Sequence, residues 1–201
     1  TVAPVTEETA QAIRSTAEIL RKAGFDVHEE RPPAVSEGSR LWIELFSQAT
    51  QQQLREFYRG NEDEAGPLVA RLLSDTEKNA TFEERINTAE RRARAVVERE
   101  RLREELLRWM KETPLILAPV GATPAFEHGA RRVLINGRSI SIFRAFSYSQ
   151  TFNVFGLPAV AVPVTHTAQG LPIGIQIVGL PNAEHRLLSA ASIVEQAFGA
   201  S

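Results

Sequence analysis

Two apolar runs near the end of the chain constrain its fold more than any other feature. The runs "AVAVPV" (residues 159–164) and "IGIQIV" (residues 173–178) are apolar on successive positions and not only on alternate ones. Strands with this pattern are covered on both faces, as in the middle of an α/β sheet. We therefore predict two interior strands, joined by a connection whose exposed tip comprises residues 165–169.

The sequence around these runs completes the expected second half. We predict a buried strand in "PLILAPV" (114–120), a loop-rich connection over residues 122–140 and a closing helix over 183–198. Pro163 has no N–H to donate to a ladder, so it predicts a bulge or a sheet edge. Few further strands remain to flank the interior ones, and we expect part of the sheet to lie outside these 201 residues.

The first half is predicted to be mainly helical. We expect helices over residues 6–23, 36–58, from Pro67 onward and over 81–112, with a short strand in "FDVHEE" (25–30). Thr6 suits an N-cap, and "TFEE" at 81–84 has the spacing of a capping box. The helix over 36–58 is expected to bury Leu41, Trp42, Leu45, Ala49 and Phe57. The longest helix is expected to bury one stripe made of Phe82, Ile86, Ala89, Ala93, Val96, Leu102, Leu106 and Trp109.

These elements define the α/β class, with a helix-rich part (1–112) and a part (113–201) in which helices cover a mixed β-sheet. A length of 201 residues suits a single domain. With 43% hydrophobic and 24% charged residues, the composition is that of a globular protein. The formal net charge of -2 provides no strong attraction to nucleic acid or to anionic lipid. No apolar run reaches the roughly 20 residues that a membrane helix needs.

The start of the chain and its lack of cysteine bear on location. Without cysteine there are no disulfides and no thiolate sites. The opening "TVAPVTEETA" has no Met, no basic segment and no apolar signal core, and we expect a cytoplasmic protein. Such an opening is typical of a piece cut from a longer polypeptide, and a processed or tagged start looks the same.

Several segments resemble the C-terminal part of amidase signature family enzymes. They are "QTFNVFGLPAVAVPV" (150–164), "GLPIGIQIVG" (170–179) and "LLSAASIVEQ" (187–196), with weaker similarity in "PLILAPVGATPAF" and "APVTEETAQAIRSTAEILRKAGFDVHE". The resemblance covers nearly the whole chain and is most specific over residues 153–179. It implies a serine hydrolase that cleaves carboxamide C–N bonds, and this chain as part of a larger α/β/α sandwich.

The catalytic residues that the resemblance implies have no match in this chain. The family uses a Ser, a cis-Ser and a Lys, and its nucleophile lies in a Gly/Ser-rich signature such as Gly-Gly-Ser-Ser-Gly-Gly. The sequence contains no adjacent pair of serines, and Lys22, Lys78 and Lys111 are predicted to be solvated surface groups. We therefore expect no catalytic residue in this chain, and no amide hydrolysis by the chain alone.

No other reactive constellation is apparent. His28, His128, His166 and His185 are scattered, without the spacing of metal ligands. A Ser-His-Asp triad has no anchor, because the motif G-x-S-x-G is missing. We expect neither a metal nor a cofactor.

The best candidates for a functional role are the four residues Phe146, Tyr148, Ser149 and Gln150, which precede the most specific segment. The resemblance implies that this region forms a wall of the substrate pocket, and aromatic residues with a few polar neighbours suit such a wall. The alternative is that Phe146, Phe152 and Phe155 belong to the core. Asn153 is expected to bond backbone at a turn or strand end rather than a substrate.

Three functions remain open from the sequence. The first is the C-terminal region of an amidase that acts on a small amide, where it completes the sheet and shapes the substrate pocket. The second is a stand-alone binding or scaffold module that uses the long helix as its partner surface. The third is a fragment of a protein that is similar to the A subunit of an amidotransferase. We expect no nucleic-acid or membrane partner, and the lack of a basic patch weighs against the third function, because that branch of the family works on charged tRNA. We expect the exposed sheet region to form a homo-oligomer, with an N-terminal segment that folds back over it as the alternative.

Overall fold

The computed structural model describes residues 3–74 and 82–199, without the side chains of 47–49, 51, 52, 68, 71, 72, 74 and 82–88. The chain forms two compact units, one of Thr1–Ser39 with Leu102–Ser201 and one of Arg40–Arg101. We call them unit 1 and unit 2. The expected single domain stays a prediction. None of the helices in the described ranges is long and apolar enough to cross a membrane.

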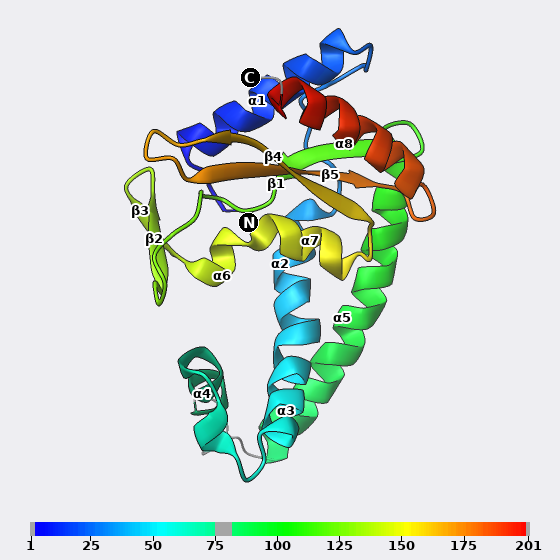
Figure 1. The fold of residues 1–201 in the computed structure, drawn as a ribbon. Coiled ribbons are helices and arrows are strands. Elements are labelled where there is room, and N and C mark those ends of the chain that lie inside the picture. Colours follow the sequence, from blue (N-terminus) through cyan, green and yellow to red (C-terminus); the bar gives the residue numbers. More distant parts are fainter. Residues whose placement is uncertain (1–2, 75–81, 200–201) are drawn as a thin grey trace. The chain divides into compact units, whose positions relative to one another are not determined.

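A three-stranded antiparallel sheet lies at the centre of unit 1 (Figure 1). Its strands are β1 (Leu115–Pro119), β4 (Ala159–His166) and β5 (Pro172–Gly179), in the order β1-β5-β4. Strands were predicted at all three places, and these predictions are confirmed. The α/β class is confirmed as well.

Helices α1 (Glu7–Lys22) and α8 (Glu184–Gly199) cover one face of this sheet (Figure 1). Thr6 caps α1, since its hydroxyl accepts a hydrogen bond from the Thr9 N–H at 3.4 Å. Their shared core contains Ala12 and Leu20 of α1, Ile173, Ile175 and Ile177 of β5, and Leu187, Ala190 and Val194 of α8. Both helices were predicted within one residue of their observed ends.

Strand β4 is only half covered. Val162 and Val164 belong to the core beneath α1 and α8, while Ala159, Ala161 and Pro163 are exposed. The register to β5 shifts between Pro163 and Thr165, which confirms the predicted bulge or edge at this proline. In the described ranges, β4 pairs with β5 alone, so one of its edges is open. Within the described ranges β5 has a neighbour on each side and β4 lies at an edge, and the expectation that further strands of the sheet lie outside these 201 residues stays a prediction.

The opposite face of the sheet carries α6 (Ile142–Ala145) and α7 (Ser147–Val154) (Figure 1). Phe152 and Phe155 are 4% and 0% exposed, so the core alternative holds for these two residues, whereas Phe146 is 41% exposed. Gly38 packs against α7 so closely that a Cβ on it would lie 2.5 Å from the Thr151 side chain. Only a residue without a side chain allows this approach.

A β-hairpin occupies part of the segment that was predicted to be a loop-rich connection. Its strands are β2 (Arg132–Ile135) and β3 (Arg138–Ser141). Asn136 and Gly137 form the turn with φ angles of 51° and 74°. Asn-Gly is favoured in such two-residue turns because both positions need a positive φ. This dipeptide between apolar residues was the signal that the prediction overlooked.

The predicted strand at 25–30 is absent from the structure. Gly24 ends α1 with a φ of 92°, and the backbone that follows forms no ladder. The guanidinium of Arg21 instead donates to the Val27 carbonyl at 2.9 and 3.2 Å. Phe25 and Val27 pack against the core of α1 and α8, which explains their alternation without a sheet partner.

The helical run after residue 34 is interrupted by a wider turn. It consists of α2 (Val35–Trp42), a π-helical segment (Ile43–Ser47) and α3 (Gln48–Phe57), followed by a short turn of 3₁₀ helix (Glu62–Glu64) and α4 (Pro67–Ser74). Leu41 and Leu45 are buried as predicted, and Trp42 is half-buried. Phe57 is 77% exposed, so its predicted burial is wrong. The side chain of Ala49 lies outside the description.

The long helix α5 (Phe82–Trp109) forms where it was predicted, but its buried stripe runs differently. Ala89, Ala93 and Val96 are exposed, whereas Ala95, Leu102, Leu106 and Met110 are buried. Val96 and Leu102 are six positions apart and lie on different faces of a helix with 3.6 residues per turn. Ala95 is seven positions from Leu102, two turns away. The side chains of Phe82 and Ile86, and the capping box at Thr81, lie outside the described part.

Candidate functional site

The four candidate wall residues lie where α6 meets α7. The Ser141 hydroxyl caps α6 by accepting from the Arg144 N–H at 3.3 Å. Phe146 ends α6 and precedes the first residue of α7. The two short helices are thus joined by Phe146 alone, without a loop. Tyr148, Ser149 and Gln150 lie in the first turn of α7, directly after this junction.

Tyr148 ties this junction to the beginning of the described chain. Its hydroxyl donates to the Ala3 carbonyl at 2.7 Å, and the Ala3 N–H donates to the Ser147 hydroxyl at 3.2 Å. Burial raises the pKa of Tyr148 above its ordinary value, while the nearby positive charge of Arg31 acts in the opposite direction. The phenol is therefore held in its neutral form, as a hydrogen-bond donor.

The side chains of Gln150 and Ser149 also form hydrogen bonds within the protein. The Gln150 side chain is buried, accepts from the Ser39 hydroxyl at 2.9 Å and donates to the Phe143 carbonyl at 2.9 Å. The Ser149 hydroxyl donates to the Phe146 carbonyl at 3.1 Å. Gln150 consequently links α2 to α6, and neither side chain is a free polar group in this structure.

Phe146 is the member of the four that presents a large surface to solvent. It is 41% exposed, and its ring centre lies 6.1 Å from that of Phe126. A Cβ on Gly121 would lie 3.8 Å from the Phe146 ring, so the backbone of the loop after β1 passes close to it. Phe143 is 47% exposed and was not singled out from the sequence. The structure thus places aromatic surface here, beside polar side chains that bond the protein itself.

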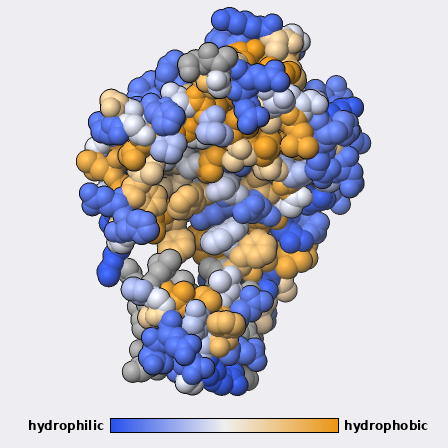
Figure 2. Space-filling view, viewed as in Figure 1, coloured by the Kyte–Doolittle hydropathy of each residue, from blue (hydrophilic) through white to orange (hydrophobic). Residues whose placement is uncertain are grey.

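Other exposed apolar side chains of unit 1 include Leu134, Leu171 and Leu188. On the face shown in Figure 2, hydrophobic and hydrophilic residues are interspersed. Because the rings of Phe126 and Phe146 are adjacent while these leucines lie on separate elements, the aromatic pair is the more specific feature.

A groove of about 370 Å³ lies on the other side of the sheet. It is lined by Glu7, Glu8 and Gln11 of α1, Thr165 and His166 of β4, and Phe198 of α8, among others. Since α1 and α8 cover the face opposite to α6 and α7, this groove is separate from the candidate wall (Figure 1). The groove and the wall are therefore distinct features of unit 1.

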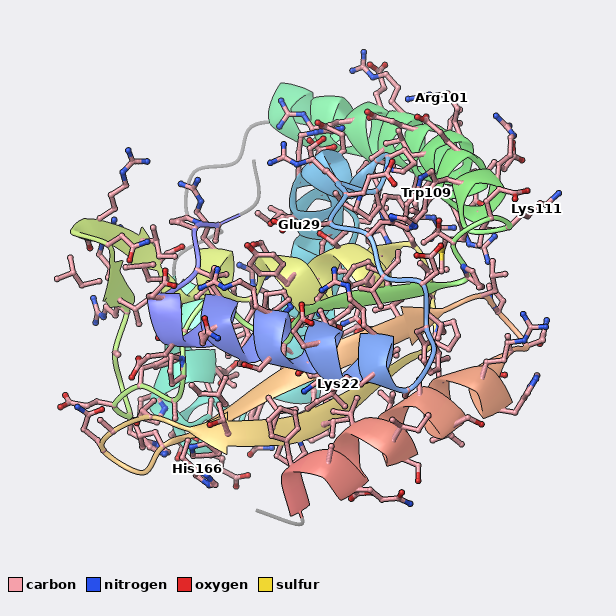
Figure 3. All side chains as sticks on the ribbon, turned by 90° about the horizontal axis from the view of Figure 1, so that it is seen from above. Lys22, Glu29, Arg101, Trp109, Lys111 and His166 are labelled. Atoms are coloured by element: carbon pink, nitrogen blue, oxygen red, sulfur yellow. The ribbon has the colours of Figure 1, made fainter. Side chains whose placement is uncertain are left out.

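The remaining reactive side chains are dispersed. Lys22, Lys111 and His166 lie on separate elements and are exposed (Figure 3). His28 contacts Asp26 at 3.0 Å on the surface, and His128 and His185 are exposed. Lys78 lies outside the described residues. Within the described ranges, no group of three His, Asp or Glu side chains is placed to hold a metal ion.

Comparison with known proteins assigns the fold to a family. Residues 1–188 match the sequence model of the family described as Amidase. The chain belongs to the amidase family. This family match includes the whole three-stranded sheet and ends within α8 (Glu184–Gly199).

Individual relatives match either a short stretch of the chain at higher sequence identity or nearly the whole chain at lower identity. The A subunit of glutamyl-tRNA(Gln) amidotransferase from Bartonella bacilliformis is 42% identical over 84 residues, which cover 42% of this chain and 17% of that protein. A crystal structure of an amidase superimposes with a TM-score of 0.79 at 21% identity, covering 97% of this chain and 43% of the other. For 6-aminohexanoate cyclic dimer hydrolase the TM-score is 0.68 at 25% identity, covering 96% of this chain and 42% of the other. The chain thus spans less than half the length of these relatives.

Proposed function

We propose that this chain is the C-terminal region of an amidase that cleaves carboxamide C–N bonds, where it completes the sheet and shapes the substrate pocket. The observation that carries this proposal is the open edge of β4. A strand that is apolar from Ala159 to Val164, yet unpaired on one side and exposed at Ala159, Ala161 and Pro163, favours a further neighbouring strand.

The backbone geometry shows what the open edge offers. The Gly179 N–H donates to the Pro158 carbonyl at 3.0 Å, so Pro158, Val160 and Val162 direct their backbone groups toward β5. Ala159 and Ala161 accordingly direct their N–H and C=O groups outward. Pro163 also lies in this outward set, but it offers a carbonyl alone. The edge can therefore pair over a short stretch that ends at the bulge.

The solved relatives support this interpretation by their size. The chain covers 43% of the amidase and 42% of the cyclic dimer hydrolase, and the superposition includes nearly all of this chain. We propose that the segment corresponding to the rest of these enzymes supplies the strand beside β4. We also propose that it supplies the Ser, cis-Ser and Lys, and that the protein is cytoplasmic.

Phe146 is the residue that we propose as the pocket wall, with Tyr148, Ser149 and Gln150 behind it. Its exposed ring, tilted against that of Phe126, offers apolar area to an acyl or amide group. The three polar side chains bond the chain itself and hold this ring in place. Their role in this proposal is to position the wall.

A second candidate function is that of the A subunit of an amidotransferase. The identity of 42% to such a protein over 84 residues favours it. The chain then belongs to a protein that works in a complex with other subunits. Amide cleavage that depends on added partner subunits distinguishes this candidate from a self-sufficient amidase.

The reading frame upstream of Thr1 and an activity assay test the proposal together. We expect the isolated chain to leave aryl and aliphatic amides intact and to remain unlabelled by a fluorophosphonate. We expect the protein encoded by the full frame to hydrolyse an amide and to be labelled on a serine outside these residues. A labelled serine within the chain, or an upstream frame without a Gly/Ser-rich signature, refutes the proposal.

Within the active full-length protein, Phe146→Ala tests the wall. Loss of the ring contact lowers kcat/KM by about tenfold, the equivalent of about 1.4 kcal/mol. Phe57→Ala is the matched control, since Phe57 is 77% exposed and belongs to unit 2. Equal kcat/KM values for the two variants contradict a wall role for Phe146.

A further inference from the structure

We propose that the groove on the α1–α8 side of unit 1 binds a small organic cation that carries an apolar group, such as an aryl- or alkylammonium ion. Its lining residues come from the first half of α1, the end of β4, the start of β5 and the last turn of α8. Figure 3 shows α1 and α8 diverging toward the beginning of α1, with His166 near this end. A volume of about 370 Å³ suits a small molecule.

The floor of the groove is apolar. Ala12 of α1 and Ile173 of β5 line it, are each 3% exposed and belong to one core cluster. Phe198 packs against the same cluster from the last turn of α8 and is half-buried. Side chains of three elements therefore offer apolar surface to one ligand.

One wall of the groove is polar and belongs to α1. Glu8, Gln11 and Ser15 are separated by three and four positions, so they share one face of this helix. The Gln11 amide donates to the Ser15 hydroxyl at 3.3 Å, and Arg14 Nε donates to Gln11 Oε1 at 3.2 Å. Arg14 also forms an ion pair with Glu7. These contacts hold the wall in place and compensate the charge of Glu7.

The charge of Glu8, by contrast, is not compensated by the chain. Glu8 is exposed, and its side chain forms no ion pair and no hydrogen bond with another described residue. The described residues that line the groove include neither Lys nor Arg. An ammonium ion can donate to this carboxylate, and hydrogen bonds between charged groups are stronger than those between neutral ones.

Thr165 faces the groove because of the bulge in β4. Val164 belongs to the core beneath α1 and α8, and in a regular strand the next residue would point to the opposite face. The register shift after Pro163 instead pairs Thr165 with Ile173, and both of them line the groove. Bulges re-aim side chains in this way. The Thr165 hydroxyl forms no hydrogen bond with another described residue, so it can accept a second N–H of the ligand.

This combination favours a cation with an apolar body over other ligands. The ammonium group lies at Glu8 and Thr165, and its alkyl or aryl group covers Ala12 and Ile173 beside Phe198. An anion is repelled by Glu8. A metal ion lacks ligands, since the described ranges contain no group of three His, Asp or Glu side chains placed to hold one. The inference does not depend on the proposed amidase activity, because α1 and α8 cover the face of the sheet opposite to α6 and α7 (Figure 1).

Amide NMR of the isotope-labelled chain tests the proposal with four probes. Benzylamine, which is protonated at neutral pH, is compared with benzyl alcohol, benzoate and methylamine. We expect benzylamine to shift the resonances of residues 7–15, 165–173 and 198 in a saturable way, with a Kd of about 1 mM. We expect benzyl alcohol and methylamine to bind at least about threefold more weakly, because the first lacks the charge and the second lacks the ring. Benzoate is expected to leave these resonances unchanged.

Two variants locate the charge and the hydroxyl. Glu8→Gln is expected to weaken benzylamine binding by about threefold or more and to leave that of benzyl alcohol unchanged. Thr165→Val keeps the branched shape of the side chain and is expected to weaken benzylamine binding by a similar factor. Glu18→Gln is the matched control, since it removes the same charge from α1 at a position that does not line the groove. The amide spectrum of each variant shows whether it is folded, and Thr165→Val decides the test if Glu8→Gln is not.

Four results overturn the proposal. The first is an absence of saturable shifts from the groove residues with benzylamine. The second is binding of benzyl alcohol or benzoate as tight as that of benzylamine. The third is an equal loss of binding in Glu18→Gln and in the groove variants. The fourth is a set of shifts confined to the surroundings of Phe126 and Phe146, which assigns the amine to the candidate wall instead.

Discussion

Tyr148 donates its phenol to a backbone carbonyl more than a hundred positions away in the sequence. Replacing Tyr148 by Phe removes this hydrogen bond and leaves the Ala3 carbonyl without that partner. We expect the free energy of unfolding to fall by about 0.5–1.5 kcal/mol. Urea denaturation measures this change, and Tyr58→Phe, at the other tyrosine of the sequence, is the control.

The same phenol makes stability depend on alkaline pH. Because burial raises the pKa of Tyr148 above 10.0, the folded chain keeps a proton that the unfolded chain releases. The contribution is complete below about pH 10 and is lost as the pH rises through the pKa of the folded state. Between about pH 8 and about pH 11 we therefore expect a flatter loss of stability in Tyr148→Phe than in Tyr58→Phe. Equal slopes contradict the assignment.

The sequence pointed to residues 146–150 only through a family resemblance, and their role as a pocket wall stays a prediction. The amide of Gln150 joins α2 to α6 through Ser39, a residue 111 positions away, and no pattern in the sequence signalled this contact. Phe126 and Phe143 were not singled out, since aromatic residues in irregular segments carry no periodic signal. Such pairings depend on tertiary packing, which local sequence patterns do not encode.

Helix α5 carries two apolar residues, Leu106 and Val97, whose exposure to solvent differs. Leu106 is fully buried, whereas Val97 is 72% exposed. Leu106→Ala is expected to lower the free energy of unfolding by about 2–5 kcal/mol, because it leaves a cavity. Val97→Ala is expected to change it by less than about 0.5 kcal/mol. Similar losses in urea denaturation refute the assignment of the buried stripe.

Sequence patterns located most elements but assigned some faces and short strands wrongly. Helices α1 and α8 and strands β1, β4 and β5 were predicted because their caps and apolar runs are local signals. The stripe of α5 failed at the step from Val96 to Leu102, where the helical repeat was not kept. "FDVHEE" failed because alternation also arises when two apolar residues pack beneath a helix without a ladder.

The open edge of β4 leads to a prediction about the whole molecule. When the isolated chain is in solution, unpaired backbone groups beside small apolar side chains favour association, and we expect dimers or larger assemblies. Ala161→Lys places a charge on the exposed face of this strand and is expected to shift the population to monomer. Light scattering after size exclusion measures the mass, with Arg186→Lys as control. A monomeric unaltered chain at high concentration contradicts this expectation.

The sequence predicted the fold class of the whole molecule but not its division into two units. The α/β class and the placement of helices over a sheet follow from the apolar runs. The division into two units, with Arg40–Arg101 forming one of them, had no signal in the sequence, because no Pro- or Gly-rich linker marks either boundary. Tertiary contacts alone separate the units.

Unit 1 is assembled from the two ends of the described chain, and this affects how it forms during translation. Helix α1 packs against β5 and α8, and about 150 residues lie between the end of α1 and the start of β5. At about 5–20 residues per second, the ribosome needs roughly 8 to 30 s to make that stretch. Throughout this time the apolar face of α1, with Ala12 and Leu20, lacks its cover by β5 and α8. The nascent chain therefore presents a binding site for chaperones until α8 is synthesised.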